Sequence, residues 1–285
     1  MADKKVLIMT DSSCDMPQSF IDENDIKVVA FNIIIDGKTY LDRRDITTVE
    51  LFKKVDELKE LPKTAAIAPS VFIDKFSKYA NDYDIVYIGL GTGFSSATSS
   101  AMVASKEFDN VYVIDSCNLS AGVGLLLNKA CKFRSEGCSA KEINDKILDI
   151  IPRVRVQFVI DTLKYLHMGG RCSGVSRILG TALQLKPIIR VVNNQMVVGK
   201  KPIGFTRGLN TLLEYYYQDK DNVDPDMMTL THCLTPKDAD YLMKRIKPDC
   251  KVKNILVTDS GCVISTHCGP RCIGILYIVN KEEEK

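Results

Sequence analysis

An alternation of strand-like and helix-like segments is the feature of this sequence that most constrains its fold. Between residues 84 and 152, short apolar runs alternate with helical segments, and loops rich in Ser, Thr, Gly and Asp separate them. Helices that connect successive strands favour parallel pairing, so the sequence predicts an α/β fold with a mostly parallel first sheet. The expected elements are the strands Asp84–Leu90 and Asn110–Asp115, the helices Ser95–Lys106 and Ser120–Arg134, and a helix that begins at a capping box of Ser139 with Glu142 and stops before Pro152.

The segments before residue 84 extend this pattern. Asp36-Gly37 closes a β-branched run and is typical of a hairpin turn, while Thr47 and Glu50 have the spacing of a capping box at the start of a helix. The elements expected here are a strand at Lys4–Thr10, a strand-like run at Ile26–Ile35, a helix from Thr47 to about Leu58 and a helix that opens at Pro69.

The second half differs because it contains a clear signal for antiparallel pairing. Asn193-Asn194 lies between two apolar runs, and such a pair favours a tight turn. We therefore expect a mixed second sheet and two tightly packed lobes, residues 1–155 and 156–285, since no linker-like stretch separates them. The expected elements are the strands Val154–Ile160, Pro187–Val192, Gln195–Gly199, Met228–His232, Lys253–Thr258 and Ile273–Val279 and the helices Thr162–Met168, Thr206–Tyr217 and Lys237–Lys247.

Composition argues against several classes of function. The 285 residues include 38 basic and 36 acidic side chains, a net charge of +2 that gives no broad field for nucleic acid or a membrane surface. No apolar run approaches the roughly 20 residues that a membrane-spanning helix needs. The N-terminus lacks the pattern of a secretory signal, so we expect a cytoplasmic protein.

The ten cysteines predict neither disulfides nor a metal site. No Cys-x-x-Cys pair occurs, and many cysteines lie in apolar contexts where they act as small hydrophobic residues. The one dense cluster is Cys262, His267, Cys268 and Cys272, in which adjacent His267 and Cys268 suit chelation of a single zinc ion poorly. No metal and no cofactor are expected.

The loop Gly91-Thr92-Gly93-Phe94-Ser95-Ser96 joins an expected strand to an expected helix. A helix N-terminus presents unpaired N–H groups and a positive dipole end, and the Ser95 and Ser96 hydroxyls could add donors for an anion. The loop is neither a Walker loop nor a G-x-G-x-x-G fingerprint. An ordinary serine N-cap is the structural alternative.

Two later segments could also face an anionic group. Gly169-Gly170-Arg171 follows an expected helix, so the glycines allow a left-handed helix end and Arg171 could bind a carboxylate bidentately. His267 lies between a hydroxyl residue and a Gly-Pro turn, and a histidine held there could donate to a carboxylate. A solvated Arg171 and a core His267 are the alternatives, and His167 and His232 are expected to be structural.

The sequence gives less support to a catalytic function. Asp11, Asp15, Asp115 and Asp161 end or follow expected strands, yet their surroundings match no phosphoaspartate hydrolase pattern, and no G-x-S-x-G motif occurs. We expect these carboxylates to anchor their loops through hydrogen bonds.

An ordered set of motifs across nearly the whole chain resembles the DegV family of bacterial fatty-acid-binding proteins, and within it the carrier subunits of fatty acid kinase. The motifs are Thr10-Asp11-Ser12-Ser13-Cys14-Asp15-Met16, Pro62-Lys63-Thr64, the Ser95-Ser96 loop with Ser100–Ser105, Val113-Ile114-Asp115-Ser116, the segment from Asp161 to Arg171, Leu185-Lys186-Pro187-Ile188 and Thr266-His267-Cys268-Gly269-Pro270.

The resemblance implies a long-chain fatty acid in a cleft between the lobes, with its carboxylate at Thr64, Ser95, Arg171 and His267. It also implies a separate ATP-dependent kinase that phosphorylates the bound carboxylate, so this chain would not be an enzyme alone. The alternatives are a stand-alone esterase or phosphotransferase that uses Ser95 and His267, and a lipid-sensing regulatory module. One departure from the family pattern is Arg271, where the family usually has glycine; we expect its side chain to turn outward.

Overall fold

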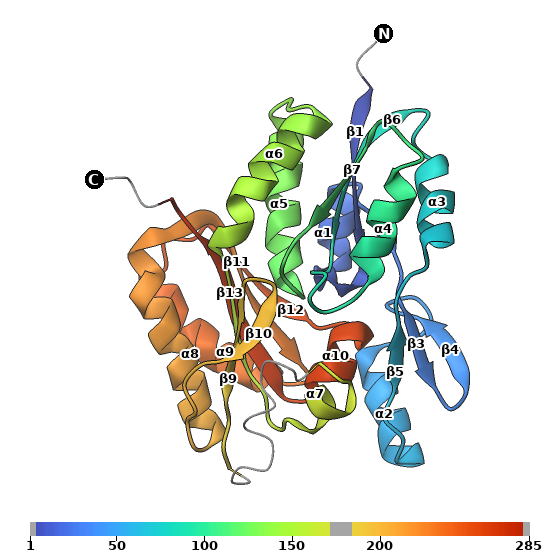
Figure 1. Ribbon diagram of the computed structural model, residues 1–285. Helices are drawn as coiled ribbons and strands as arrows, with labels where there is room; N and C mark the ends of the chain where they lie inside the picture. The colour runs from blue at the N-terminus through green and yellow to red at the C-terminus, as the bar shows by residue number, and fades with distance from the viewer. Residues whose placement is uncertain (1–3, 172–183, 282–285) are drawn as a thin grey trace.

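Four parallel strands form the sheet of the first lobe in the computed structural model, which describes residues 4–171 and 184–281 (Figure 1). Their order is β2-β1-β6-β7, and every pairing between them is parallel, as the alternation of strands and helices predicted. The central strands are buried on both faces, which explains why they read as continuous apolar runs. The strands are β1 (Lys5–Asp11), β2 (Lys27–Val29), β6 (Tyr83–Gly89) and β7 (Val111–Asp115).

Helices cover both faces of this sheet. In Figure 1, α5 and α6 lie on the face turned towards the second lobe, and α3 and α4 lie on the opposite face. The predicted capping boxes are present at Thr47 with Glu50 and at Ser139 with Glu142, where α2 and α6 begin. The helices of this lobe are α1 (Gln18–Glu23), α2 (Thr48–Leu58), α3 (Pro69–Ser77), α4 (Ala97–Ser105), α5 (Ala121–Ser135) and α6 (Ala140–Ile150), with a 3₁₀ turn, η1 (Ser12–Cys14), after β1.

A small antiparallel sheet, β4-β3-β5, extends the first lobe beside α2 (Figure 1). The β-branched run Ile26–Ile35 does not form one strand: its first part is β2 of the parallel sheet, and its second part is β3 of the small sheet. The chain changes sheet at Phe31, whose N–H donates to the Ser12 hydroxyl at 3.1 Å. The hairpin at Asp36-Gly37 is confirmed. The strands are β3 (Asn32–Ile35), β4 (Lys38–Leu41) and β5 (Lys63–Ala65).

The second lobe is built on a mixed sheet, as predicted, and its strand order is β10-β9-β8-β13-β11-β12. The Asn193-Asn194 turn joins β9 to β10, and both residues have the positive φ that a tight hairpin turn requires. The sequence boundary proposed at residue 155 falls within β8, the first strand of this sheet along the chain. The strands are β8 (Val154–Val159), β9 (Ile188–Val192), β10 (Gln195–Val198), β11 (Val223–Cys233), β12 (Asn254–Asp259) and β13 (Cys272–Val279).

Two long helices, α8 and α9, cover the outer face of the mixed sheet, whereas α7 and α10 lie at its edge near the small sheet (Figure 1). Helix α10 carries His267 and was not expected from the sequence. The helices of this lobe are α7 (Lys164–Met168), α8 (Phe205–Asp219), α9 (Pro236–Ile246) and α10 (Cys262–Cys268), with 3₁₀ turns at Ile151–Arg153, Lys220–Asn222 and Lys247–Asp249.

A continuous apolar core joins the two lobes. Helix α5 contacts strands of both large sheets, and one cluster of buried side chains runs from Leu7 and Leu126 to Val156 and Leu276. Polar contacts reinforce this junction. They are Lys129 with Asp224 and Asp226, Arg43 with the carbonyl of Asp259, and Asn194 with Thr92 and Gly93.

Within residues 4–171 and 184–281, no helix combines the length and apolar character needed to cross a bilayer. The same residues contain no group of three or more His, Cys, Asp or Glu side chains arranged to hold a metal ion. Their cysteines are free thiols.

Candidate carboxylate site between the lobes

A largely apolar cavity of about 850 Å³, counting the space at its mouth, lies between the lobes. Leu90 and Leu119 line it from the first lobe, and Val156, Phe158 and Leu276 line it from the mixed sheet. A cavity with such walls suits a ligand with a long apolar part, while a few polar groups can fix its orientation.

Four of the five predicted site residues line this cavity: Thr64, Ser95, Arg171 and His267. Thr64 on β5 and His267 near the end of α10 are hydrogen-bonded, with 3.0 Å between Oγ1 and Nε2. Arg171 follows α7 and its charge acts on the His267 ring. The Arg171 Nε donates to the carbonyl of Phe94, the residue before Ser95, at 3.3 Å. These contacts connect Thr64, His267 and Arg171 into one polar group and bring Arg171 to the backbone beside Ser95.

Ser95 and Ser96 differ in their contacts and in their position relative to the cavity. The Ser95 Oγ accepts the N–H of Ala97 at 3.2 Å, so its own proton remains available for a ligand. Ser96 is exposed at the start of α4, makes no side-chain capping bond, and does not line the cavity. The structure therefore brings Ser95 to the other predicted residues and leaves Ser96 outside.

The glycines of the Gly91–Ser96 loop serve a contact between the lobes. A Cβ atom at Gly93 would lie 1.8 Å from the carbonyl oxygen of Asn194, and one at Gly91 would lie 2.5 Å from its Oδ1. The Gly93 N–H donates to Asn194 Oδ1, and the Thr92 N–H donates to Asp115 Oδ1. The N–H groups of Thr92 and Gly93, which lie in the loop predicted to bind an anion, are therefore already hydrogen-bonded to protein side chains.

The two glycines before Arg171 have separate roles. A Cβ atom at Gly169 would lie 2.2 Å from Nδ1 of His267, so only glycine lets the ring approach this closely. Gly170 has a φ of 69°, in the left-handed region that glycine adopts without steric cost. The Gly-Gly-Arg sequence therefore seats the imidazole and then turns the chain so that Arg171 reaches the cavity.

The electrostatics of this polar group favour an anion. Burial, assisted by the Arg171 charge, lowers the pKa of His267 to about 4, so the imidazole is neutral at pH 7. Among the residues that the structure describes, Arg171 contacts the carbonyl oxygens of Phe94 and Gly169 but no carboxylate. A half-buried guanidinium without a counter-ion is a site at which an anion is stabilised.

The contacts do not assemble a Ser–His–acid triad from Ser95 and His267. The Nε2 atom of His267 bonds to Thr64, and Nδ1 has no hydrogen-bond partner within the described residues. A triad needs the histidine between the nucleophile and an orienting carboxylate. The aspartates at the strand ends anchor loops instead, as predicted: Asp11 accepts from Ser13 of its own loop and from Leu90 after β6, and Asp115 accepts from Cys117 of its own loop and from Thr92.

Arg271 turns outward, as predicted. Its Nε lies 3.2 Å from Oδ2 of Asp238, its guanidinium stacks over Phe205 at 4.1 Å from the ring centroid, and it does not line the cavity. Its φ is 56°, a left-handed conformation that costs a residue with a side chain more than glycine. This conformation explains the glycine usual at this place in the pattern that the sequence resembles.

Sequence reasoning missed three hydroxyl residues of the lining and found one residue only through resemblance. Ser120, Thr231 and Ser260 also line the cavity. Ser120 ends the loop after β7, whereas Thr231 and Ser260 follow no local motif. Thr64 had no local signal either, because its partner His267 is 203 residues away.

Comparisons with known proteins agree with this architecture. A family model described as "Uncharacterised protein, DegV family" matches residues 5–280. A DegV domain-containing protein of Clostridium acetobutylicum is 32% identical over 279 residues, which cover 96% of this chain and 99% of that protein.

Two solved structures are also similar. A DegV family protein of Thermus thermophilus, described by its fatty acid binding, superimposes with a TM-score of 0.92 at 25% identity and covers 97% of this chain and 100% of its own. A stearic-acid-binding protein of Eubacterium ventriosum gives 0.86 at 25% identity and covers 95% and 97%. The chain belongs to the DegV family.

Proposed function

We propose that this protein binds a long-chain fatty acid between its lobes, with the carboxylate at Thr64, Ser95, Arg171 and His267, and presents it to a separate kinase in the cytoplasm. The observation that carries the proposal is the cation of Arg171, which has no carboxylate partner among the described residues and lies at a largely apolar cavity. The similarity to proteins described as fatty-acid-binding supports the same ligand class.

The energetics fit a fatty acid. Burying about 14 methylene groups contributes on the order of 11 kcal/mol of gross transfer free energy. Burying a carboxylate costs several kcal/mol unless donors satisfy it. Ser95 and Thr64 offer hydroxyl protons, and Arg171 offers N–H donors and a compensating charge. The tail would supply most of the affinity, and the head group would fix the position of the ligand.

Native mass spectrometry of the chain purified from a bacterial host tests the ligand. We expect a retained mass equal to that of a fatty acid, which disappears after delipidation and returns when oleate is added. A protein that carries no fatty acid and does not take up oleate would contradict the proposal.

The kinase half of the proposal has its own test. The chain has no nucleotide-binding loop of its own in its sequence, so ATP and oleate with this chain alone should give no acyl phosphate. Turnover without a partner would contradict the carrier role. A fluorophosphonate probe separates the esterase alternative, because stoichiometric labelling of Ser95 requires an activated nucleophile.

Thr64→Ala and Ser95→Ala should each weaken oleate binding. Each change removes a hydroxyl donor from a buried carboxylate, which costs about 1.5–3 kcal/mol, or roughly 10- to 150-fold in Kd. Isothermal titration of delipidated protein measures the loss, and Ser96→Ala, at the exposed neighbouring hydroxyl, is the matched control. Unchanged affinity in both variants, with folding intact, would remove these residues from the site.

Arg271→Gly should leave oleate affinity nearly unchanged at low and at high salt. The guanidinium contacts Asp238 and Phe205 on the outside of the second lobe and is absent from the cavity lining. A loss of about tenfold or more, equivalent to about 1.4 kcal/mol, would show that Arg271 acts on the carboxylate.

A further inference from the structure

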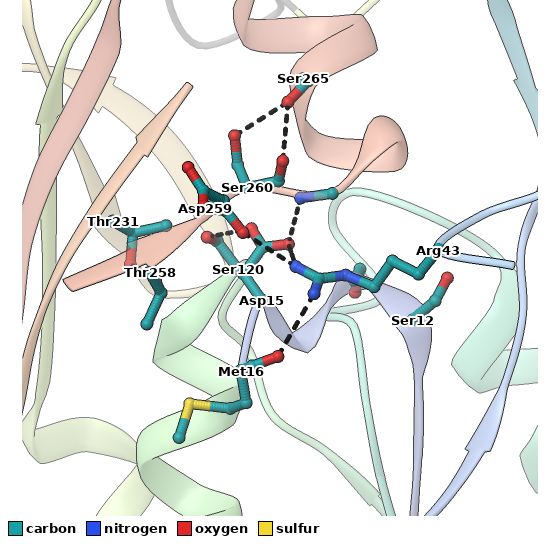
Figure 2. Close-up of polar contacts among 12 residues, drawn as sticks. Ser12, Asp15, Met16, Arg43, Ser120, Thr231, Thr258, Asp259, Ser260 and Ser265 are labelled. Carbon is teal, nitrogen blue, oxygen red and sulfur yellow. Dashed lines mark hydrogen bonds and ion pairs between the residues drawn. The ribbon is translucent and has the colours of Figure 1, made fainter. Parts of the chain in front are cut away.

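The segment that begins helix α10 belongs to the second lobe but is held by side chains of the first. Figure 2 shows the centre of this contact, where Arg43 and Asp15 meet the chain that runs from Asp259 through Ser260 into α10. Oδ1 of Asp15 accepts the N–H of Gly261 at 2.8 Å. The Arg43 guanidinium donates to the carbonyl of Asp259 at 2.9 Å.

Asp15 is fully buried, and both of its carboxylate oxygens accept hydrogen bonds. Besides Gly261, its Oδ1 accepts from Arg43 at 3.0 Å, and its Oδ2 accepts from the Ser120 hydroxyl at 2.5 Å. Burial raises the pKa of Asp15 to about 6, and the Arg43 charge opposes that rise. The carboxylate is therefore mainly ionised at pH 7, in a buried place where it persists only because these donors surround it.

A second carboxylate repeats the arrangement one residue further along. Oδ1 of Asp42 accepts the N–H of Cys262 at 2.8 Å, and the Thr48 hydroxyl donates to the carbonyl of Ser260 at 2.8 Å. The start of α10 thus has its N–H groups bound by two acids of the first lobe. Gly261 permits this approach, because a Cβ atom there would lie 2.7 Å from Nε of Arg43.

The other end of α10 carries the proposed ligand-binding histidine. The helix has seven residues, Cys262–Cys268, and its regular hydrogen bonds make it a short rigid element. His267 meets Thr64 at the far end, and Val263 and Ile264 line the cavity between the two ends. A shift of the first turn would therefore move both the apolar wall and the imidazole.

Asp11 provides an internal contrast. It belongs to the same motif and is equally buried, but it accepts hydrogen bonds from Ser13, Tyr87 and Leu90, which all belong to the first lobe. Of the two buried aspartates in this motif, Asp15 reaches across to α10, and Asp11 has all of these contacts within its own lobe.

We propose that Asp15 is a positioning residue which, by binding the chain at the start of α10, sets the place of His267 in the carboxylate site. Arg43 keeps the Asp15 carboxylate in place and ties it to the same segment through the Asp259 carbonyl. This inference rests on the proposed function for its consequence in binding, but the position of His267 can be measured without a ligand.

The test is an NMR titration of the imidazoles in delipidated protein. The chain has three histidines, so His167→Gln and His232→Gln assign the signals. In the wild type we expect His267 to titrate at about 4. In Asp15→Ala the ring should lose its buried position and its pKa should rise towards the ordinary 6.5, and oleate affinity should fall about tenfold or more.

Two matched variants separate positioning from general loss of stability. Asp15→Asn keeps an oxygen for Gly261, so it should restore the low pKa of His267 and an affinity within about threefold of wild type. Asp11→Asn should lower the melting temperature and leave the His267 titration unchanged. If Asp15→Ala does not fold, Gly261→Ala displaces the same helix start and should raise the His267 pKa.

The inference is overturned if His267 still titrates at about 4 in the folded Asp15→Ala protein, or in Gly261→Ala if that variant has to be used. It is also overturned if Asp11→Asn raises the pKa as much as Asp15→Ala does. A wild type that binds no oleate would contradict the proposed function alone, because the titration is made without ligand.

Discussion

Replacing Lys129 with methionine is expected to lower the free energy of unfolding by about 3–5 kcal/mol, the scale for removing one partner of a buried ion pair. Lys129 on α5 is 7% exposed, and its Nζ lies 2.7 Å from Asp224 and 2.6 Å from Asp226 on β11. Methionine retains most of the apolar stem but leaves two carboxylates together at the lobe junction. Urea unfolding at pH 7 measures the loss.

The loss of unfolding free energy in Lys129→Met should become smaller at low pH. Burial raises the pKa of Asp226, but the ion pairs with Lys129 and Lys132 outweigh it and hold the pKa at about 2. A depressed carboxyl pKa contributes stability above the ordinary value of 3.8, and this contribution disappears as the pH falls through about 2. In Lys129→Met the Asp226 pKa rises, so the stability difference from wild type should narrow on acidification below pH 4.

Lys132→Met is the control for that experiment. The Lys132 side chain is 47% exposed and bonds only to Asp226 among the carboxylates of the described residues. Removing it should cost no more than about 1 kcal/mol. If both variants lost the same free energy of unfolding, the burial of Lys129 would not be the reason for its larger expected effect.

Gly169→Ala should weaken oleate binding by about 3 kcal/mol, roughly a hundredfold. The new methyl group would lie 2.2 Å from Nδ1 of His267, so the ring must leave its position and its bond to Thr64. Two donors of the carboxylate site are then misplaced by one methyl group. Titration calorimetry on delipidated protein measures the effect.

The neighbouring glycine supplies the matched control. Gly170→Asn places a side chain where no atom of the described residues lies within 4 Å of a Cβ atom, and asparagine tolerates the positive φ of this residue. We expect affinity within about threefold of wild type. If Gly169→Ala binds as well as Gly170→Asn, close packing against His267 is not required.

Elements with local signals could be predicted from the sequence. The capping boxes at Thr47 and Ser139 mark the starts of α2 and α6, and Asn193-Asn194 marks the turn between β9 and β10, because each signal acts within a few residues. The parallel pairing of the first sheet followed from the alternation of strands and helices, which needs no knowledge of distant contacts.

Elements fixed by distant partners could not be predicted. Helix α10 has no side-chain cap of its own, and its first N–H groups are bound by Asp15 and Asp42, more than 200 residues earlier. Strand β5 has only three residues and exists through pairing with β3. Thr64 and His267 lie on these two elements, so the geometry of the carboxylate site was beyond local reasoning even though its residue types were foreseen.

The unbroken core between the lobes has a consequence for how a ligand enters and leaves. A hinge that swung one lobe away as a rigid body would expose to water the buried side chains that α5 shares with both sheets. That cost disfavours separation of the whole lobes as the route of ligand exchange. Exchange should instead need only a local movement at the rim of the cavity, and its rate should respond to substitutions at the rim while remaining insensitive to those that destabilise the whole fold.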